Sequence, residues 1–387
     1  MNMASDFSRR EFLARAALAG LVTVIPPRNE AGNNMNSNHI SYPSSATARL
    51  TDLLGISLPI VQAPAGGTVS SDMIAAVSNS GGLGGIPLSW SPPDEAIETI
   101  RSVTRKTSKP YFVNFVLHFE PAALEPALDI GAPIVQFSWG MPDRRRVAAI
   151  RSAGAVMGIQ VTSSASAKRA LDCGADYLVC QGTEAGGHVH ASRPLARALE
   201  EVLGVAGEVP VLASGGIASG HKVYRYMAMG AAGVVMGSRF VASVESAAHG
   251  QYKQALVQAT SADTVITTCM NKGWDNATHR ILRNSTYEMW ESAGCPATGT
   301  RPGETDVIAF HAGDPAKSVE RYSINSPGAR YGGDLEAMAA YAGTSVDDIT
   351  ELASVEEIFA RIRAEYREAS RTSDPASARG SAHRGEA

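Results

Sequence analysis

The segment DYLVCQGTEAGGHVH, residues 176–190, joins a short apolar run to a glycine-rich loop that carries a carboxylate and an imidazole. The run Asp176–Cys180 predicts a buried strand, and the loop begins where that strand ends. Gly186 and Gly187 favour a backbone that approaches a ligand closely or adopts a positive φ. His188 then lies on a tight loop as a group suited to taking a proton near neutral pH. The segment therefore predicts a strand that ends in a reactive loop; a glycine turn with an incidental histidine is the alternative.

On both sides of this segment, from Leu58 onward, apolar runs of strand length alternate with amphipathic stretches of helix length. The predicted strands are residues 59–63, 83–86, 111–117, 134–137, 156–161, 177–181, 209–213 and 233–236. The predicted helices lie near residues 70–80, 93–106, 121–130, 143–152, 164–173, 192–204 and 219–229, with another after Ala242. Such alternation implies parallel strands, and this number of units predicts an α/β fold, a (β/α)8 TIM barrel. A doubly wound sheet is the alternative, but Pro64 after the first strand departs from the GxGxxG fingerprint.

The two ends of the chain differ in composition from the barrel. Residues 1–27 contain SRREFL (8–13) and a weakly apolar run, and they resemble a twin-arginine export signal that is too short for a stable membrane helix. They predict a periplasmic or exported protein that engages the twin-arginine export machinery; an N-terminal amphipathic helix of a cytoplasmic protein is the alternative. Residues 28–48 predict a disordered linker, and residues 370–387 a disordered tail.

The region between these ends divides into two parts. Residues 49–260 are predicted to form the barrel. Residues 261–369 are predicted to form a post-barrel region, either a lid over the barrel mouth or a small subdomain, with C-terminal helices. Within this region, residues 335–341 and 355–369 predict C-terminal helices. The composition, 44% hydrophobic with a net charge of −4, supports a substantial core and offers no basic footprint for nucleic acid. The cysteines show no CxxC pairing, and no metal site is predicted.

Amide side chains stand in the predicted strands near the end where such barrels carry their active sites. Asn114 lies in the third strand, Gln136 in the fourth and Gln160 in the fifth, and Gln181 ends the sixth. A buried amide without a partner costs roughly 1–3 kcal/mol. Amides from four strands at one barrel mouth therefore predict a polar planar ligand; hydrogen bonds among themselves or to water are the alternative.

Two glycine turns follow the seventh and eighth strands, where such barrels bind phosphate. Gly215 and Gly216 lie in the first turn, and Gly237 and Ser238 in the second. Backbone N–H groups, a hydroxyl and helix N-termini in these turns suit an anion. Together with the amides, the turns predict a heterocycle with one terminal phosphate, which fits flavin mononucleotide (FMN).

The motifs PIVQAP (59–64), QGTEAGGH (181–188), SGGIASG (214–220) and GAAGVVMGSRF (230–240) resemble the nitronate monooxygenase family, formerly called 2-nitropropane dioxygenases. The resemblance spans roughly residues 50–365. It implies an FMN-dependent barrel that oxidises alkyl nitronates with O2 to a carbonyl compound and nitrite, without a nicotinamide. It implies that His188 is the catalytic residue, which removes the α-proton where the neutral nitroalkane is the substrate. From the pattern and the resemblance together, the predicted cofactor-binding residues are Ala63, Pro64, Ala65, Asn114, Gln136, Gln160, Gln181, Gly186, Gly187, Gly215, Gly216, Val235, Met236, Gly237 and Ser238.

The chain departs from the family pattern at three positions. Ala65 replaces the usual methionine after the first strand, His190 replaces a glycine, and Ser238 replaces a threonine. The first departure enlarges the pocket and leaves the substrate open. Glu184 is predicted to orient the loop or to be a solvated carboxylate, and His190 to be an exposed loop residue.

Three alternative functions stay open. They are an FMN-dependent enoyl-[acyl-carrier-protein] reductase that uses NAD(P)H, an NADH:quinone reductase, and a non-catalytic flavin-binding protein. A twin-arginine signal disfavours the two reductases, because carrier protein and NADH are cytoplasmic. Predicted partners are therefore a small-molecule nitronate and O2.

Overall fold

The structure, a computed structural model, describes residues 44–372. The predicted export signal lies outside the described residues, as do most of the predicted linker and tail. The linker prediction is wrong for residues 44–48, because Ser44 caps α2 (Ser45–Leu54) by accepting a hydrogen bond from the Thr47 N–H at 3.2 Å. The tail prediction is wrong for residues 370–372, which complete the last helix.

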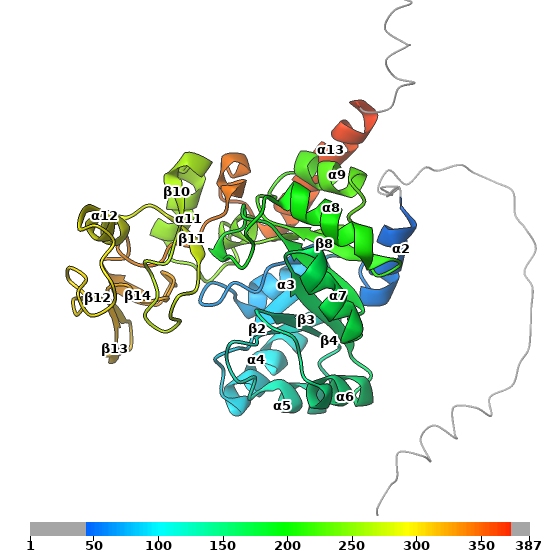
Figure 1. Cartoon of the computed structure of the whole chain (residues 1–387), viewed down its shortest axis with the longest axis horizontal. Helices are drawn as coiled ribbons and strands as arrows, with labels where there is room; N and C mark the ends of the chain where they lie inside the picture. Colours follow the sequence, from blue (N-terminus) through cyan, green and yellow to red (C-terminus); the bar gives the residue numbers. More distant parts are fainter. Residues whose placement is uncertain (1–43, 373–387) are drawn as a thin grey trace, which may run out of the picture. The chain divides into compact units, whose positions relative to one another are not determined.

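In the described part of the chain, eight parallel strands form the central sheet in the order β1-β9-β8-β6-β5-β4-β3-β2 (Figure 1). Their bounds are β1 (Ile60–Gln62), β2 (Gly84–Pro87), β3 (Tyr111–Val116), β4 (Ile134–Ser138), β5 (Val156–Val161), β6 (Tyr177–Gln181), β8 (Val211–Ser214) and β9 (Gly233–Met236). A parallel bridge between Val61 and Leu83 joins the two outer strands, and the Leu83 N–H donates to the Ile60 carbonyl at 3.0 Å. The predicted barrel is therefore confirmed, with strand ends shifted by one or two residues.

The N-terminal end of the barrel is filled by side chains. Leu50 and Leu54 of α2 share one buried cluster with Val61, Phe112 and Tyr177 from the strands. Successive strand residues point to opposite faces, so alternate side chains enter this inner cluster or the outer one that faces the helices. The inner cluster leaves the opposite end of the barrel, where the strands finish, as the end that holds a cavity.

Helices cover the outside of the barrel (Figure 1). Those that follow its strands are α3 (Ser71–Asn79), α4 (Pro93–Thr104), α5 (Leu124–Asp129), α6 (Arg144–Ser152), α7 (Ser164–Asp172), α8 (Leu195–Ala206), α9 (Gly220–Ala228) and the short α10 (Ser238–Val241). Their inner faces and the outward side chains of the strands form one continuous core. The first seven correspond to the predicted helices. None of the helices within residues 44–372 has both the length and the apolarity to cross a bilayer.

The helix that completes the barrel comes from the end of the chain. The helix predicted after Ala242 does form, as α11 (Gly250–Gln258), but it packs in a separate cluster. Instead, α13 (Val355–Thr372) packs against both α9 and α3, where the eighth helix of such a barrel belongs. The Gly220 N–H donates to Glu365 of α13 at 2.6 Å, and a Cβ at Gly220 would collide with the α13 backbone. The prediction that the helix after Ala242 completes the barrel is therefore wrong.

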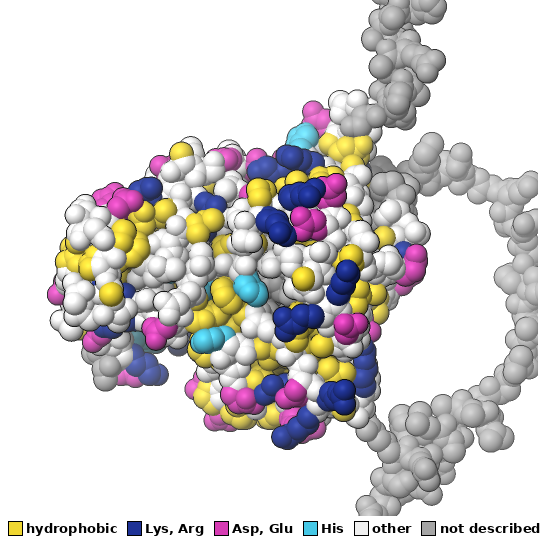
Figure 2. Space-filling view, viewed as in Figure 1, with side chains coloured by type: hydrophobic (Ala, Val, Ile, Leu, Met, Phe, Trp, Pro, Cys, Tyr) yellow, Lys and Arg dark blue, Asp and Glu magenta, His cyan; other side chains and the backbone are white. Residues whose placement is uncertain are grey.

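The post-barrel region contains two small antiparallel sheets. Their strands are β10 (Thr264–Thr267), β11 (His279–Leu282) and β7 (Gly187–His188) in one, and β13 (Asp314–Glu320), β12 (Val307–His311) and β14 (Tyr331–Gly333) in the other. The helical elements are α12 (Ser285–Ser292) and the single turns η1 (Ser261–Asp263) and η2 (Thr344–Asp348). Because β7 belongs to the loop after β6, the subdomain is tied to the barrel mouth by a shared sheet. On the face shown in Figure 2, basic and acidic side chains are interspersed over the barrel, and apolar side chains are exposed on both the barrel and the subdomain.

The predicted helix at residues 335–341 is wrong. The segment is irregular, and its carbonyl groups accept hydrogen bonds from other elements. Asn284 donates to the Met338 carbonyl at 2.8 Å, and the Leu282 N–H donates to the Ala340 carbonyl at 2.8 Å. These tertiary partners replace the bonds that a helix would make within itself, which is why local propensity fails here.

Candidate active site at the barrel mouth

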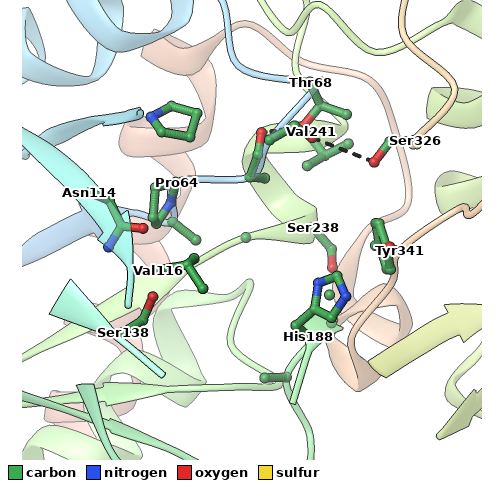
Figure 3. A pocket seen from close by; sticks show the side chains of 18 of the residues that line it. Pro64, Thr68, Asn114, Val116, Ser138, His188, Ser238, Val241, Ser326 and Tyr341 are labelled. Atoms are coloured by element: carbon green, nitrogen blue, oxygen red, sulfur yellow. Dashed lines mark hydrogen bonds between the residues drawn. The ribbon is translucent and has the colours of Figure 1, made fainter. Parts of the chain in front are cut away.

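A cavity of about 550 Å³ lies at the C-terminal ends of the barrel strands, the end that carries the active site in barrels of this class. Its size suits a cofactor or small molecule. Figure 3 shows Asn114 and Ser138 on one side and His188 and Tyr341 on the other. Besides His188, the predicted site residues that line the cavity are Ala63, Pro64, Ala65, Asn114, Gln136, Gln160, Gln181, Gly186, Gly187, Gly215, Gly216, Val235, Gly237 and Ser238.

Met236 is the one predicted contact that does not line the cavity. Its side chain is fully buried in the outer core with Val234, whereas Val235 between them belongs to the inner cluster. The two-residue period of a strand explains the difference, because adjacent side chains point to opposite faces. The Met236 side chain therefore points away from the cavity, unlike the other predicted cofactor-binding residues.

The amides at the mouth are held to different degrees. Asn114 donates from Nδ2 to the Gln136 carbonyl at 3.0 Å, and Gln136 accepts from the Tyr177 hydroxyl at 3.2 Å. Gly158 makes room for the Tyr177 ring, since a Cβ there would collide with it. Gln160 has no side-chain hydrogen bond to any residue within 44–372 and stays available to a ligand. The side-chain donors and acceptors of Asn114 and Gln160 that have no protein partner are thus the polar groups left for a ligand in the cavity.

Gln181 holds the loop that carries His188. Its Nε2 donates to the His188 carbonyl at 3.1 Å, and its Oε1 accepts from the His190 N–H at 2.8 Å. Both ends of the amide are therefore engaged with the loop, although the side chain still lines the cavity. The main role of Gln181 is therefore to orient the loop that carries His188. Only the second Nε2 hydrogen and the second Oε1 lone pair are left for a ligand.

Two further contacts fix the same loop. Both carboxylate oxygens of Glu184 accept from the Leu195 N–H, at 2.8 and 3.0 Å, at the N-terminus of α8, where a negative charge is favourable. Arg280 donates to the Thr183 carbonyl at 2.8 Å from Nη2 and 3.1 Å from Nε. Glu184 therefore orients the loop, as one of its two predicted roles proposed, and does so by capping a helix.

A close backbone approach explains the first glycine of the EAGGH motif. A Cβ on Gly186 would collide with the backbone of Ala342 and Gly343, at the start of η2. The Gly343 N–H donates to the Ser238 hydroxyl at 3.0 Å. The loop after β6, the turn after β9 and the η2 turn therefore meet at one point beside the cavity.

The two glycine turns expose backbone donors. Gly215 and Gly216 have positive φ values of 126° and 68°, which glycine adopts without strain. Within residues 44–372, the N–H groups of Gly216, Gly237 and Ser238 donate to no protein acceptor. Buried or half-buried N–H groups without partners are rare in folded proteins. Their clustering beside a cavity is typical of a site for an anion.

His188 is held neutral by its surroundings. Burial, and secondarily the nearby His279, lower the pKa of His188 to about 3. Its Nε2 is buried and has no hydrogen-bond partner among the described residues. The Trp274 ring stacks on it at 4.2 Å between centroids, and Tyr341 lies at 5.4 Å. The ring therefore lines the cavity as a neutral imidazole, which keeps one nitrogen free of a proton, in an aromatic environment.

His279 fixes the loop that carries Trp274. Its ring is fully buried, Nδ1 lies 2.9 Å from the Ala277 carbonyl, and Nε2 accepts from the Met270 N–H at 3.2 Å. The acceptor role of Nε2 places the proton on Nδ1, so the ring is neutral and bridges both ends of the loop. Burial lowers the pKa of His279 to about 4, against a smaller opposing effect of the Ala277 carbonyl.

The sequence patterns missed several cavity residues. Trp139 and Tyr341 line the cavity, as do Trp90 and Ser345, and none of them lies in the motifs considered. Trp139 has a positive φ of 57°, an uncommon conformation for a non-glycine residue that no sequence signal indicates. Trp274 and residues 324–326 of the post-barrel subdomain also line the cavity.

The lining carries no formal charge. Among the described residues that line the cavity, none is Lys, Arg, Asp or Glu, and His188 is neutral near pH 7 because its pKa is about 3. No group of three or more potential metal ligands occurs within residues 44–372. The cavity therefore binds through amides, backbone N–H groups and aromatic faces.

These features fit a flavin. The unpartnered N–H groups of Gly216, Gly237 and Ser238 suit a phosphate, and the free amide of Gln160 suits a heterocycle with donors and acceptors on its edge. Figure 3 shows Ser238 and Asn114 apart from each other, so the residues that would hold the phosphate and those that would hold the ring are separated.

Comparisons with known proteins agree with this site. A model of the nitronate monooxygenase family matches residues 47–130 and 121–365. A nitronate monooxygenase of Pseudomonas aeruginosa is 33% identical over 304 residues, 66% of this chain and 84% of that protein. A (3aS,4S,5R,7aS)-5-hydroxy-7a-methyl-1-oxo-octahydro-1H-indene-4-carboxyl-CoA dehydrogenase of Mycobacterium tuberculosis is 32% identical over 248 residues, 63% of this chain and 68% of that protein. Among solved structures, nitroalkane oxidase from Streptomyces ansochromogenes has a TM-score of 0.69 and 27% identity, covering 84% of this chain and all of that one, 100%. With its barrel confirmed and the family model matched over most of its length, this chain belongs to the nitronate monooxygenase family of flavin oxidoreductases.

Proposed function

We propose that this protein is an FMN-dependent nitronate monooxygenase, which oxidises alkyl nitronates or their parent nitroalkanes with O2 to a carbonyl compound and nitrite. The observation that carries the proposal is the unpartnered Nε2 of a neutral His188 in an uncharged cavity that offers amides and anion-binding turns. Family membership and the nitroalkane oxidase likeness support the same chemistry.

Two groups of residues would hold FMN. The N–H groups of Gly216, Gly237 and Ser238 would receive the phosphate, and Asn114 and Gln160 would receive the polar edge of the ring. When bound, the flavin supplies the electron transfer between the nitronate carbon and O2. A single phosphate site without a dinucleotide fingerprint favours FMN over FAD.

His188 is placed to take the α-proton of a neutral nitroalkane. Its buried environment disfavours the protonated imidazole in the free enzyme, which keeps the base ready near pH 7. Proton transfer creates a nitronate anion beside the imidazolium, and this opposite charge stabilises the protonated ring at the moment when it forms. Loop 182–190, fixed by Gln181 and Glu184, holds the imidazole in position.

The second candidate is an FMN-dependent NAD(P)H reductase of the same barrel family, such as an enoyl-[acyl-carrier-protein] or quinone reductase. The relative from Mycobacterium tuberculosis is a carboxyl-CoA dehydrogenase by name, and this likeness favours the second candidate. Nicotinamide dinucleotides and CoA carry several phosphates, and no Lys or Arg among the described residues lines the cavity to pair with them. Mixing the holoenzyme anaerobically with NADH, NADPH or a nitronate separates the candidates, since only the electron donor bleaches the flavin absorbance rapidly.

His188→Ala tests the proposed base. Turnover of the neutral nitroalkane should fall about 10²–10⁴-fold, because general-base catalysis is lost. Turnover of the pre-formed nitronate should fall much less, since its proton is already gone. His221→Ala, on the exposed surface of α9, is the matched control and should change neither rate. Equal losses on both substrate forms would exclude His188 as the base.

The pH profile gives an independent test. An ordinary histidine base loses activity as the pH falls through about 6.5. Because burial lowers the pKa of His188 to about 3, kcat/KM for the nitroalkane should show no decrease near 6.5 that belongs to this residue. A fall centred near pH 6.5 that disappears in His188→Ala would contradict the buried neutral state.

We also propose that the protein is exported through the twin-arginine route, on the basis of residues 8–13, SRREFL. This route passes folded proteins, so the flavin would enter the barrel in the cytoplasm before export. The only small molecules that the proposed reaction then requires outside the cytoplasm are the nitro compound and O2, because no nicotinamide takes part.

A further inference from the structure

Two unusual residues that take no part in the proposed mechanism meet beside the proposed base. Trp139, directly after β4, has a positive φ of 57°, and His190 stands where the family pattern has a glycine. Their rings stack with centroids 4.7 Å apart and an interplanar angle of 14°. The indole also lines the cavity. We refer to these two residues as the Trp139–His190 pair.

The backbone of Trp139 is held in an uncommon conformation. A positive φ is costly for a residue with a bulky side chain, and such residues persist only where the surrounding structure enforces them, often at active sites. The carbonyl of Ser138 accepts from the Leu117 N–H at 2.8 Å, and a Cβ on Gly140 would collide with Leu117. These contacts fix the chain on both sides of Trp139, so the turn sets the direction of the indole.

The partner ring belongs to the loop that carries the base. The amide of Gln181 donates to the His188 carbonyl at 3.1 Å and accepts from the His190 N–H at 2.8 Å. His190 is exposed, as the sequence predicts, yet one face of its imidazole lies against the indole. A glycine at position 190 would keep the backbone bond to Gln181 but would offer no ring to Trp139. The His190 side chain therefore supports the indole and is not needed to hold the backbone of the loop.

The indole stands close to the place that a reacting carbon must reach. Its centroid lies 6.3 Å from that of His188, and the two rings meet edge to face. Figure 3 shows Ser138, the residue before Trp139, across the cavity from His188. A base takes a proton within hydrogen-bond reach, about 2.6–3.2 Å between heavy atoms. Because both rings line one cavity, a carbon that reaches the imidazole lies beside the indole, and its substituents meet that ring.

Trp139 differs in this respect from the other tryptophan near the base. Trp274 is only 4% exposed, because it is stacked between His188 and His118. Trp139 is half-buried and has one stacking partner, His190. Part of the Trp139 ring is therefore free to contact a ligand, whereas the Trp274 ring is occupied by protein.

We infer that the Trp139–His190 pair limits the bulk of the carbon that reacts at His188. The favoured substrates are nitro compounds with a single carbon substituent on the nitro-bearing carbon, and those branched at this carbon are disfavoured. A second substituent would press on an indole that is held by its own backbone and by His190, and such overpacking is destabilising. The inference rests on the proposed function and names the substrate class of the same site.

Steady-state kinetics of the holoenzyme with the nitronates of nitroethane and 2-nitropropane test this limit, because the two differ by one methyl group on the reacting carbon. The expected kcat/KM is about 10-fold or more higher for nitroethane. Trp139→Ala should reduce this ratio to about 3-fold or less, mainly through a gain for 2-nitropropane, which a merely damaged structure would not produce. Phe310→Ala, an exposed aromatic on β12 outside the cavity lining, should leave the ratio unchanged.

Substitutions of His190 test the support of the indole. His190→Phe keeps a flat ring and should retain the ratio of the parent protein. His190→Ala should lower the ratio about 3-fold, because the indole loses the ring that holds it. His221→Ala, at an exposed position on α9, is the matched control and should not change the ratio. The same ratio in the parent, Trp139→Ala and His190→Ala would overturn the inference, and oxidation of both nitronates would leave the proposed function intact.

If neither nitronate is oxidised, the proposed function fails, and equilibrium binding then tests the inference alone. Propanoate and 2-methylpropanoate resemble the two nitronates in shape but carry no nitro group, and the flavin absorbance of the holoenzyme reports their binding. The expected affinity is about 10-fold higher for propanoate in the parent protein and nearly equal for the two in Trp139→Ala. Equal affinities in the parent protein, or binding of neither carboxylate, would overturn the inference as well.

Discussion

Replacement of His279 by leucine should destabilise the subdomain and release the loop that carries Trp274. His279 is fully buried, and its ring joins the Met270 N–H to the Ala277 carbonyl at opposite ends of that loop. Leucine has a similar volume but neither a donor nor an acceptor. Both backbone groups would then lie buried without partners, since Met270 is 0% and Ala277 2% exposed.

The expected loss follows from these two groups. Each buried backbone group without a partner costs about 1–3 kcal/mol, so the pair costs about 2–6 kcal/mol. The apolar leucine recovers part of this through burial, which leaves a net loss of about 2–4 kcal/mol. His279→Asn keeps a side-chain donor near the Ala277 carbonyl and should lose about half as much. His221→Leu, at an exposed position on α9, should stay within about 0.5 kcal/mol of the parent protein.

The same residue makes the protein sensitive to acid. The pKa of His279 is about 4 in the folded chain and about 6.5 when unfolded. Its contribution is therefore complete above pH 6.5 and is lost as the pH falls from 6.5 toward 4, because the unfolded state binds the proton first. The difference amounts to about 3 kcal/mol. His279→Leu should accordingly lose less stability over this pH range than the parent.

Urea unfolding followed by circular dichroism and tryptophan fluorescence measures these values at pH 7.5 and 5. A His279→Leu protein that is as stable as His221→Leu at pH 7.5 would refute the bridging role of the imidazole.

Three other predictions concern the cofactor site and the N-terminus. Gly186→Ala should separate the EAGGH loop from η2, lower the stability of the fold by about 1–3 kcal/mol through overpacking and lower the flavin content. The control, Gly204→Ala on the open face of α8, should instead raise the stability of the fold by up to about 1 kcal/mol. Equal effects of the two changes on Tm would contradict the close approach of Gly186 to η2. Chromatography of the denatured holoprotein should identify FMN, and recovery of FAD or a colourless protein that cannot be reconstituted would rule out the single-phosphate site. Changing Arg9 and Arg10 together to lysine should hold the protein in the cytoplasmic fraction; finding the parent protein there already would refute the export proposal.

Local sequence patterns were enough to predict the barrel and the end of it that carries the site. Strand-to-helix alternation is a short-range signal, and parallel strands must place all their C-terminal ends together. The order of the strands therefore brings Asn114, Gln160 and Gly216 to one mouth without any knowledge of side-chain contacts. The resemblance of QGTEAGGH and the glycine turns to a known family was likewise visible in the chain alone and is confirmed by the family match.

Other features depend on contacts between residues far apart in the chain. The completion of the barrel by α13 requires its packing against α3 and α9, which no local period encodes. Residues 335–341 stay irregular because Asn284 and Leu282 bind their carbonyl groups. Within the site, the two-residue period of the strand predicts that the side chains of Met236 and Val235 point to opposite faces. Which of the two points into the barrel is decided only when the sheet closes in the folded chain.

The character of the active site was also decided by the tertiary structure. The sequence marked His188 as a titratable loop residue, but its low pKa arises from burial, and the Trp274 ring that stacks on it comes from a distant part of the chain. Gln181 could be recognised as a polar residue at a strand end, yet only the folded loop shows that its amide holds His188 and His190. Desolvation and aromatic packing are sums over neighbours from several elements. The chain alone therefore predicted His188 as a titratable loop residue, and the fold determined its protonation state and the shape of the cavity that it lines.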